Sequence, residues 1–199
     1  MPDLNSDLFN LAMSEKAQPL MDAVQKHIVE NVDPITEEFF ALDEEKEDRW
    51  TWHPRQLELL EGAKEKAKAS GLWNFFLPDS DIGEGLTNLD YAYIAFELGK
   101  SALASETLNC SAPDTGNMEV LERVGTPEQK EQWLKPLLNG EIRSAYAMTE
   151  PAHPSSDAKN IATSAVLDGD EWVINGEKYY ISGAGDPRCK ILITMVRTD

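Results

Sequence analysis

Residues Ser144 to Gly183 read SAYAMTEPAHPSSDAKNIATSAVLDGDEWVINGEKYYISG, and this stretch is the most informative part of the sequence. A short apolar run opens at Thr149-Glu150-Pro151 into a loop rich in Pro and Ser. Strand-like segments follow, with tight-turn signals at Asp168-Gly169-Asp170 and Asn175-Gly176. Hydroxyls and backbone donors therefore gather at strand ends, which suits the binding of a flat, polar ligand. An antiparallel meander with a polar loop and no ligand is the alternative that spacing alone leaves open.

The hydrophobic pattern changes from helical to alternating near Gly140, and this change predicts a domain boundary there. Residues 1–12 read as an N-terminal arm, 13–140 as a helical domain and 141–199 as an incomplete β-domain. The predicted fold class is α+β, with an all-α helical bundle followed by the start of an antiparallel β-barrel. We expect about five strands in the β-domain by the usual strand lengths: Ile142–Met148, Ile161–Leu167, Glu171–Ile174, Glu177–Ser182 and Lys190–Arg197.

Helix signals divide the first domain. Asp33-Pro34 fits an N-cap followed by proline at the first helical position, and Gly71 fits the end of a helix that starts at Pro54. Thr126-Pro127-Glu128-Gln129 reads as a capping box that starts a helix to about Leu138. A further helix is predicted from Asn88 to Lys100, with these side chains buried: Leu89, Ala92, Tyr93, Phe96 and Leu98.

The chain has 199 residues and a net charge of -18, with 36 acidic against 18 basic residues. This balance argues against binding of nucleic acid and of an anionic membrane surface. The two cysteines, Cys110 and Cys189, do not form a disulfide framework, and this favours a reducing compartment. The sequence shows no membrane-spanning run and no signal or transit pattern, so we expect a cytoplasmic protein without membrane insertion, or an organellar-matrix protein if eukaryotic.

Several other kinds of site are argued against. No H-E-x-x-H, P-loop or G-x-S-x-G motif is present, and the scattered histidines predict no metal site. Asp79, Asp81 and Asp90 fall in an EF-hand-like register, but Glu84 stands where that loop must turn sharply. Trp50 and Trp52 either pack locally or dock a partner.

The quoted stretch resembles the flavin-binding region of acyl-CoA dehydrogenases. The likeness rests on Thr149-Glu150-Pro151, a Ser-Asp pair, the pattern GD-x-x-V-I-N-G-x-K, and then an aromatic, an aliphatic and a hydroxyl residue. It extends upstream through the stretches Gly71–Asn74, Ala112–Glu119 and Trp133–Leu138. These motifs occur in order over nearly the whole chain, and they are similar to the branch that includes eukaryotic multidomain dehydrogenases.

The resemblance implies a cofactor, FAD, and the α,β-dehydrogenation of an acyl-CoA thioester. Thr149 would serve the N1/O2 edge of the flavin, Ser182 its N5, and the Tyr180 ring would pack on it. The loop after Thr149 is one residue longer than is usual in the family, so which serine meets the phosphate stays open. Tyr180 and Ser182 stand where Trp and Thr are usual. The implied cofactor-binding residues are Tyr146, Met148, Thr149, Ser155, Ser156, Tyr180, Ile181 and Ser182, with Ser156 also near the substrate.

The family's catalytic base lies in a C-terminal helical domain that is absent from this chain, so we assign no catalytic residue here and expect the fragment alone to be inactive. Helices at 88–100 and 102–112 would wall the acyl cavity. Implied partners are acyl-CoA, electron-transfer flavoprotein or a similar acceptor, and further copies in a homodimer or homotetramer, in fatty acid metabolism. A flavin oxidase of the same fold and a non-catalytic subunit are the alternatives.

Overall fold

A computed structural model of the chain describes residues 11–78 and 82–198. The chain folds into two compact units, Met1–Ser111 and Ala112–Asp199. The boundary near Gly140 remains a prediction about domain organisation. Asp79 and Asp81, from the rejected calcium register, lie outside the described residues.

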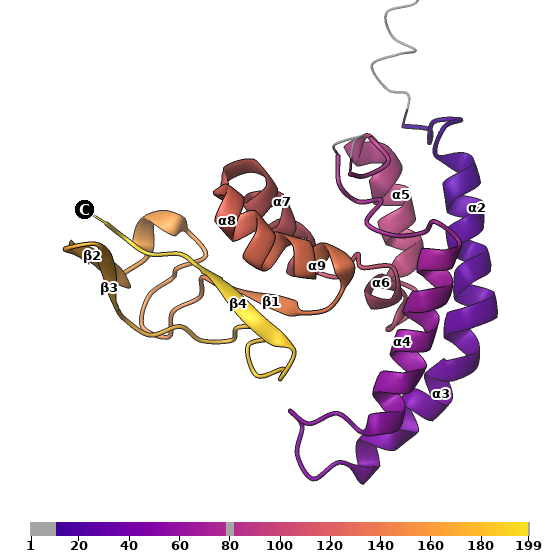
Figure 1. Ribbon diagram of the computed structural model, residues 1–199, viewed down its shortest axis with the longest axis horizontal. Coiled ribbons are helices and arrows are strands. Elements are labelled where there is room, and N and C mark those ends of the chain that lie inside the picture. The colour runs from indigo at the N-terminus through magenta and orange to yellow at the C-terminus, as the bar shows by residue number, and fades with distance from the viewer. Residues whose placement is uncertain (1–10, 79–81, 199) are drawn as a thin grey trace, which may run out of the picture. The chain divides into compact units, whose positions relative to one another are not determined.

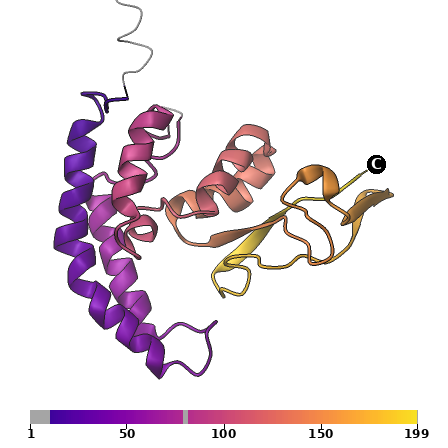
Figure 2. The same cartoon turned by 180° about the vertical axis from the view of Figure 1, so that it is seen from behind.

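The first unit is helical. In Figures 1 and 2, α4 and α5 run alongside the long helix that α2 and α3 form together. Its largest fully buried side chains include Val24, Leu60, Phe75 and Ile94. The elements are α2 (Gln18–His27), a π-helical turn (Ile28–Val32), α3 (Asp33–Ala41), a 3₁₀ turn (Leu42–Glu45), α4 (Pro54–Ala69), α5 (Asn88–Leu98) and α6 (Ala104–Thr107).

The predicted N-cap at Asp33-Pro34 is wrong, because the helix continues through this point. The amide of Asp33 donates to the carbonyl of Ile28, five residues back, and no side chain caps the position. A proline ring normally clashes with the carbonyl four residues before it, and the wider π turn relieves that crowding. The hydroxyl of Thr36 donates to the carbonyl of Val32 at 2.8 Å.

Helix α5 has the predicted bounds within two residues, but the prediction of its buried face is largely wrong. Leu98 is buried as expected, and Leu89 is half-buried. Phe96 is 73% exposed, whereas Ile94 is completely buried. Both sides of this helix carry apolar residues, so the sequence period alone could not choose the buried one. Ala92 and Tyr93 are also exposed.

Trp52 packs locally, which is one of the two alternatives stated from the sequence. Its ring lies 5.9 Å from that of Phe39, and the Lys46 ammonium lies over it at 5.5 Å. The Trp50 ring is exposed and lies under the guanidinium of Arg49.

The second unit begins with helices and continues into strands. The predicted capping box is confirmed, because Gln129 and Thr126 exchange side-chain and main-chain hydrogen bonds at 3.0 and 3.3 Å. The elements are α7 (Asp114–Val124), α8 (Pro127–Gln129), a π turn (Lys130–Leu134), α9 (Lys135–Asn139), β1 (Arg143–Ala147), a 3₁₀ turn (Ala158–Asn160), β2 (Ser164–Asp168), β3 (Glu171–Asn175) and β4 (Cys189–Thr194).

The strands form two pairs. β2 and β3 make the predicted antiparallel hairpin, which turns through Gly169 at a φ of 63°. β1 lies beside β4 in both views and pairs with it in parallel, not in the antiparallel arrangement that we expected. A helical region followed by the start of a β-domain confirms the predicted fold class.

The strand predicted at Glu177–Ser182 is wrong. The segment forms no ladder, because its backbone leaves the extended conformation at Tyr180, where φ is 54°, and next to it at Gly183, where φ is 83°. Instead it lies against residues 148–150 through separate contacts, described below. Within 11–78 and 82–198, no helix is long and apolar enough to cross a membrane, and no group of His, Cys, Asp and Glu could hold a metal ion.

Candidate functional site

The candidate site lies where β1 ends. Tyr146, the next-to-last residue of the strand, has an exposed ring, and Met148 is half-buried just beyond it. Thr149 follows and is exposed. The end of β1 therefore presents an aromatic ring and a hydroxyl to solvent.

A second segment meets this end of β1. The amide of Tyr179 donates a hydrogen bond to the carbonyl of Thr149 at 2.8 Å. The Tyr180 ring, 80% exposed, lies 4.1 Å from that of Tyr179 between centroids. Ile181 and the exposed Ser182 follow at once. Tyr180 has a left-handed φ of 54°, a conformation that costs free energy for a non-glycine residue and is concentrated at ligand sites.

Glu150 holds three segments together beneath these residues. Its carboxylate is buried and accepts from the amides of Ala162 and Thr163, each at 2.8 Å. The ammonium of Lys178 lies 2.9 Å from the same carboxylate and donates to the carbonyl of Met148 at 3.0 Å. The Thr163 side chain, these amides and Lys178 together hold the pKa of the Glu150 carboxyl far below its usual range. Glu150 therefore stays ionised.

The loop after Thr149 separates its two serines. Ser155 is buried, and its hydroxyl oxygen accepts the Glu150 amide at 2.6 Å. Ser156 is exposed. Asp157 accepts from the amide of Lys159 at 3.1 Å and so caps the 3₁₀ turn. Ser155 shapes the loop, and Ser156 is the serine that a ligand could reach.

Gly176 leaves no room for a side chain. A β-carbon there would lie 2.7 Å from the Cα and Cβ atoms of Thr163, closer than real contacts allow. A cavity of about 190 Å³ lies between this glycine and the Glu150–His153 loop. That volume is too small for a whole dinucleotide, so the cavity by itself defines no cofactor site.

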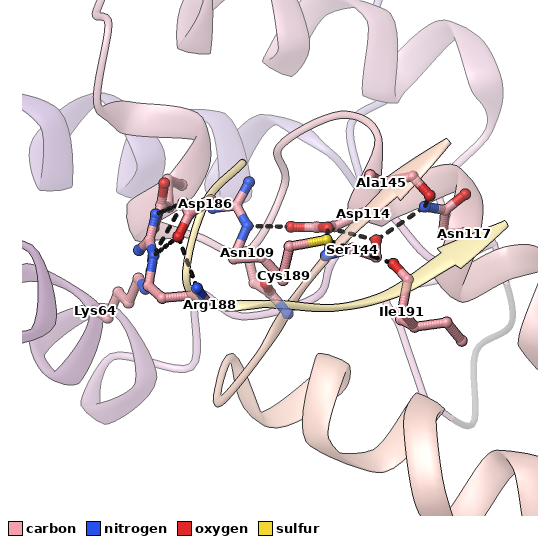
Figure 3. A network of polar contacts seen from close by, with 12 residues as sticks. Lys64, Asn109, Asp114, Asn117, Ser144, Ala145, Asp186, Arg188, Cys189 and Ile191 are labelled. Carbon is pink, nitrogen blue, oxygen red and sulfur yellow. Dashed lines mark hydrogen bonds and ion pairs between the residues drawn. The ribbon is translucent and has the colours of Figure 1, made fainter. Parts of the chain in front are cut away.

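The start of β1 is anchored from α7, as Figure 3 shows. The Asp114 carboxylate accepts from both the amide and the hydroxyl of Ser144, at 2.8 and 2.6 Å, and forms an ion pair with Arg143. The side-chain amide of Asn117 donates to the Ser144 hydroxyl at 2.9 Å and to the Ala145 carbonyl at 3.1 Å. Asp114, Asn117 and Ser144 are all buried. A strand with both ends tied down can hold its last residues still.

The predicted site residues therefore fall into two groups. Tyr146, Met148 and Thr149 lie together with Tyr180, Ile181 and Ser182, because the Tyr179–Thr149 hydrogen bond joins their segments. The exposed rings and hydroxyls of this first group fit a flat, polar ligand such as a flavin. In the second group, Ser156 is accessible and Ser155 is not.

Reasoning from the sequence did not identify the residues that hold the site together, which are Glu150, Lys178, Asp114 and Asn117. Glu150 and Lys178 belong to the motifs that carry the resemblance, but the motifs do not indicate that both side chains are largely buried. No local signal marks these four residues, because each stands among polar, glycine or proline residues in the sequence. Charged and amide residues are seldom buried unless they are paired.

Comparison with known proteins gives the class of the chain. Residues 14–141 match the family model described as acyl-CoA dehydrogenase, N-terminal domain, and residues 145–199 match acyl-CoA dehydrogenase, middle domain. The chain belongs to the acyl-CoA dehydrogenase family, which confirms the resemblance.

Curated relatives and solved structures agree. Acyl-CoA dehydrogenase family member 10 of Mus musculus is 49% identical over 191 residues, which are 90% of this chain and 18% of that protein. Probable acyl-CoA dehydrogenase FadE2 of Mycobacterium tuberculosis is 58% identical over 142 residues, 71% of this chain and 34% of that protein. A solved structure from Mycobacterium abscessus, described as a candidate acyl-CoA dehydrogenase, matches with a TM-score of 0.85 and 47% identity. The match covers 94% of this chain and 47% of that one, so the chain spans about half the length of this solved relative.

Proposed function

We propose that the full-length protein containing this chain binds FAD at the end of β1 and dehydrogenates an acyl-CoA thioester between its α and β carbons. The supporting observation is the 2.8 Å hydrogen bond from Tyr179 to Thr149, which brings two separate motifs to one place. Family membership supports the reaction class. A solved acyl-CoA dehydrogenase of Bacillus anthracis, which shares the fold at 24% identity, is complexed with FAD.

FAD, when bound, accepts the hydride that leaves the β-carbon of the thioester. The hydroxyl of Thr149 would donate to the N1/O2 edge of the flavin, and that of Ser182 to N5. The Tyr180 ring would pack on the flavin face, and the main chain at Tyr146, Met148 and Ile181 would line it. Such donors stabilise the negative charge that develops on the ring system.

Ser156 is the serine that we assign to the phosphate and thioester side, since the Ser155 hydroxyl oxygen already accepts the Glu150 amide. The α-proton would go to a carboxylate that none of these residues supplies. The chain carries 36 acidic against 18 basic residues, so its overall field repels the anionic cofactor and substrate. Local hydroxyl and amide donors have to overcome that repulsion.

The test is FAD retention in the full-length protein. We expect the double variant Thr149→Ala with Ser182→Ala to purify with less FAD per chain, read from the flavin absorbance at about 450 nm. The matched control is Thr51→Ala with Ser70→Ala, one exposed threonine and one exposed serine of the first unit, whose hydroxyls donate to nearby carbonyls. Equal FAD content in the two double variants would contradict the assignment.

The electron acceptor that we propose is electron-transfer flavoprotein or a similar carrier. Oxygen uptake during acyl-CoA turnover separates this reading from an oxidase of the same fold. Dehydrogenation with an artificial acceptor but no oxygen consumption is the expected result. Absence of turnover in a full-length protein that holds FAD would favour the non-catalytic alternative.

A further inference from the structure

Lys178 lies just before the Tyr179–Ser182 segment, and its side chain contacts the residues on either side of Thr149, although it is not one of the residues proposed to touch the flavin. Its side chain is only 11% exposed, and that of Glu150 is 3% exposed. The ammonium donates to the carbonyl of Met148 at 3.0 Å and to the Glu150 carboxylate at 2.9 Å. Residues 148 and 150 flank Thr149.

The main chain adds a second tie directly beside the first. Tyr179 follows Lys178, and its amide donates to the carbonyl of Thr149. Successive contacts therefore join residues 178 and 179 to residues 148, 149 and 150. This segment forms no β-ladder, so these contacts help to set the separation between the Thr149 and Ser182 hydroxyls.

The ammonium of Lys178 is charge-compensated where it lies. A buried lysine needs a paired anion, and Glu150 supplies it. Two of its donors are directed at protein oxygens. A lysine that held the cofactor phosphates would instead leave its charge open to solvent or ligand.

We propose that Lys178 is a positioning residue for the flavin, which sets the spacing of the Thr149 and Ser182 segments and does not bind the cofactor phosphates. This inference rests on the proposed function. It goes further because it gives the Lys178 ammonium a structural role at the site. It also predicts that this ammonium does not contact the cofactor phosphates.

The experiment uses the full-length protein stripped of flavin and reconstituted with FAD. We expect Lys178→Met to weaken FAD affinity about tenfold or more, as for the loss of hydrogen bonds to a charged group. The visible circular dichroism of the bound flavin should also change at saturating FAD, because the ring sits differently. The salt dependence of FAD affinity should keep its wild-type slope, since no phosphate contact is lost.

The matched control is Lys135→Met, which removes an exposed lysine that pairs with Glu131 at 2.6 Å on the helical part of the same unit. It should leave affinity and spectrum unchanged. Lys178→Arg is the second variant. Its planar, longer head keeps the charge but cannot reproduce both contacts, so we expect a smaller loss of affinity and an altered spectrum.

Wild-type affinity and spectrum in Lys178→Met, or in Lys178→Arg where Lys178→Met does not fold, overturn the proposal. A flatter salt dependence in the variant also overturns it, because that result identifies a phosphate contact. Failure of the wild-type protein to take up FAD is a different result, which removes the proposed function itself and this inference with it.

Discussion

The amide of Tyr179 and the carbonyl of Thr149 are joined by a 2.8 Å hydrogen bond, although the two residues stand thirty positions apart in the sequence. The intervening chain forms the serine loop and the β2–β3 hairpin and then returns to the end of β1. This return brings the segment that contains Tyr180 and Ser182 to the segment that contains Thr149. Thr149 and Ser182 are exposed, whereas the side chains of Glu150 and Lys178, which hold the backbone nearby, are largely buried.

The buried Glu150 carboxylate should make the second unit sensitive to acid. Its pKa is lowered on folding, so the stability that it contributes is present above the ordinary glutamate value near 4.5 and is lost as pH falls below it. We expect the free energy of unfolding, measured with urea, to drop between pH 5 and acid conditions. Glu150→Gln should flatten this drop, and at pH 7 it should destabilise the second unit because Lys178 loses its charge partner.

Glu131→Gln is the control for this acid effect, because it removes the exposed partner of Lys135 and should change stability by less than about 1 kcal/mol. An unaltered acid slope in Glu150→Gln would contradict the prediction.

His27 should give the first unit a separate pH dependence. Burial, followed by the charge of Lys66, lowers the pKa of His27 below its ordinary 6.5, and the ring contacts the Thr107 hydroxyl at 3.2 Å. The folded state therefore resists protonation, and stability is greatest above pH 6.5 and falls as pH decreases below it. His27→Gln should remove this fall in urea unfolding curves. His53→Gln, at a half-buried helix cap, serves as the comparison.

Two residues of α5 test which side of that helix is buried. Ile94 is fully buried, so Ile94→Ala should cost about 2–5 kcal/mol in urea unfolding of the 199-residue chain. Phe96 is 73% exposed, and Phe96→Ala should change stability by about 0.5 kcal/mol or less. A larger loss of stability in Phe96→Ala than in Ile94→Ala would support the buried face that the sequence predicts.

Gly176 should not tolerate a β-carbon. Gly176→Ala places that carbon 2.7 Å from the backbone and Cβ of Thr163, and it should destabilise the second unit by about 1–3 kcal/mol and lower FAD retention. Gly116→Ala, on α7 of the same unit, meets no atom within 4 Å and should stabilise by up to about 1 kcal/mol. The measurement is the thermal unfolding of each variant, compared with that of the wild-type protein.

Local chemistry made part of the fold predictable. The Thr126 capping box and the Gly169 turn depend on neighbours within a few residues, so the sequence alone specifies them. The π turns were not predictable in the same way. Each lies just before an X-Pro pair, Asp33-Pro34 or Lys135-Pro136, and such a pair is also a normal helix start.

Long-range partners account for the rest. Glu177–Ser182 alternates like a strand but has no ladder partner in the described part of the chain, so its conformation follows from single contacts with Met148, Thr149 and Glu150. The resemblance assigned the candidate site residues to positions along the sequence. It did not indicate that Ser155 would be buried, because that depends on the path of a loop one residue longer than usual.

The parallel pairing of β1 with β4 sets an order of events during synthesis of the protein. Arg143–Ala147 leave the ribosome well before Cys189–Thr194. β1 can pair with its parallel partner only after the whole chain between the two strands has been synthesised. Before that point, the α7 side chains of Asp114 and Asn117 can already form hydrogen bonds with β1. Completion of the β1–β4 pair is therefore a late step, and the helices that precede it have time to fold first.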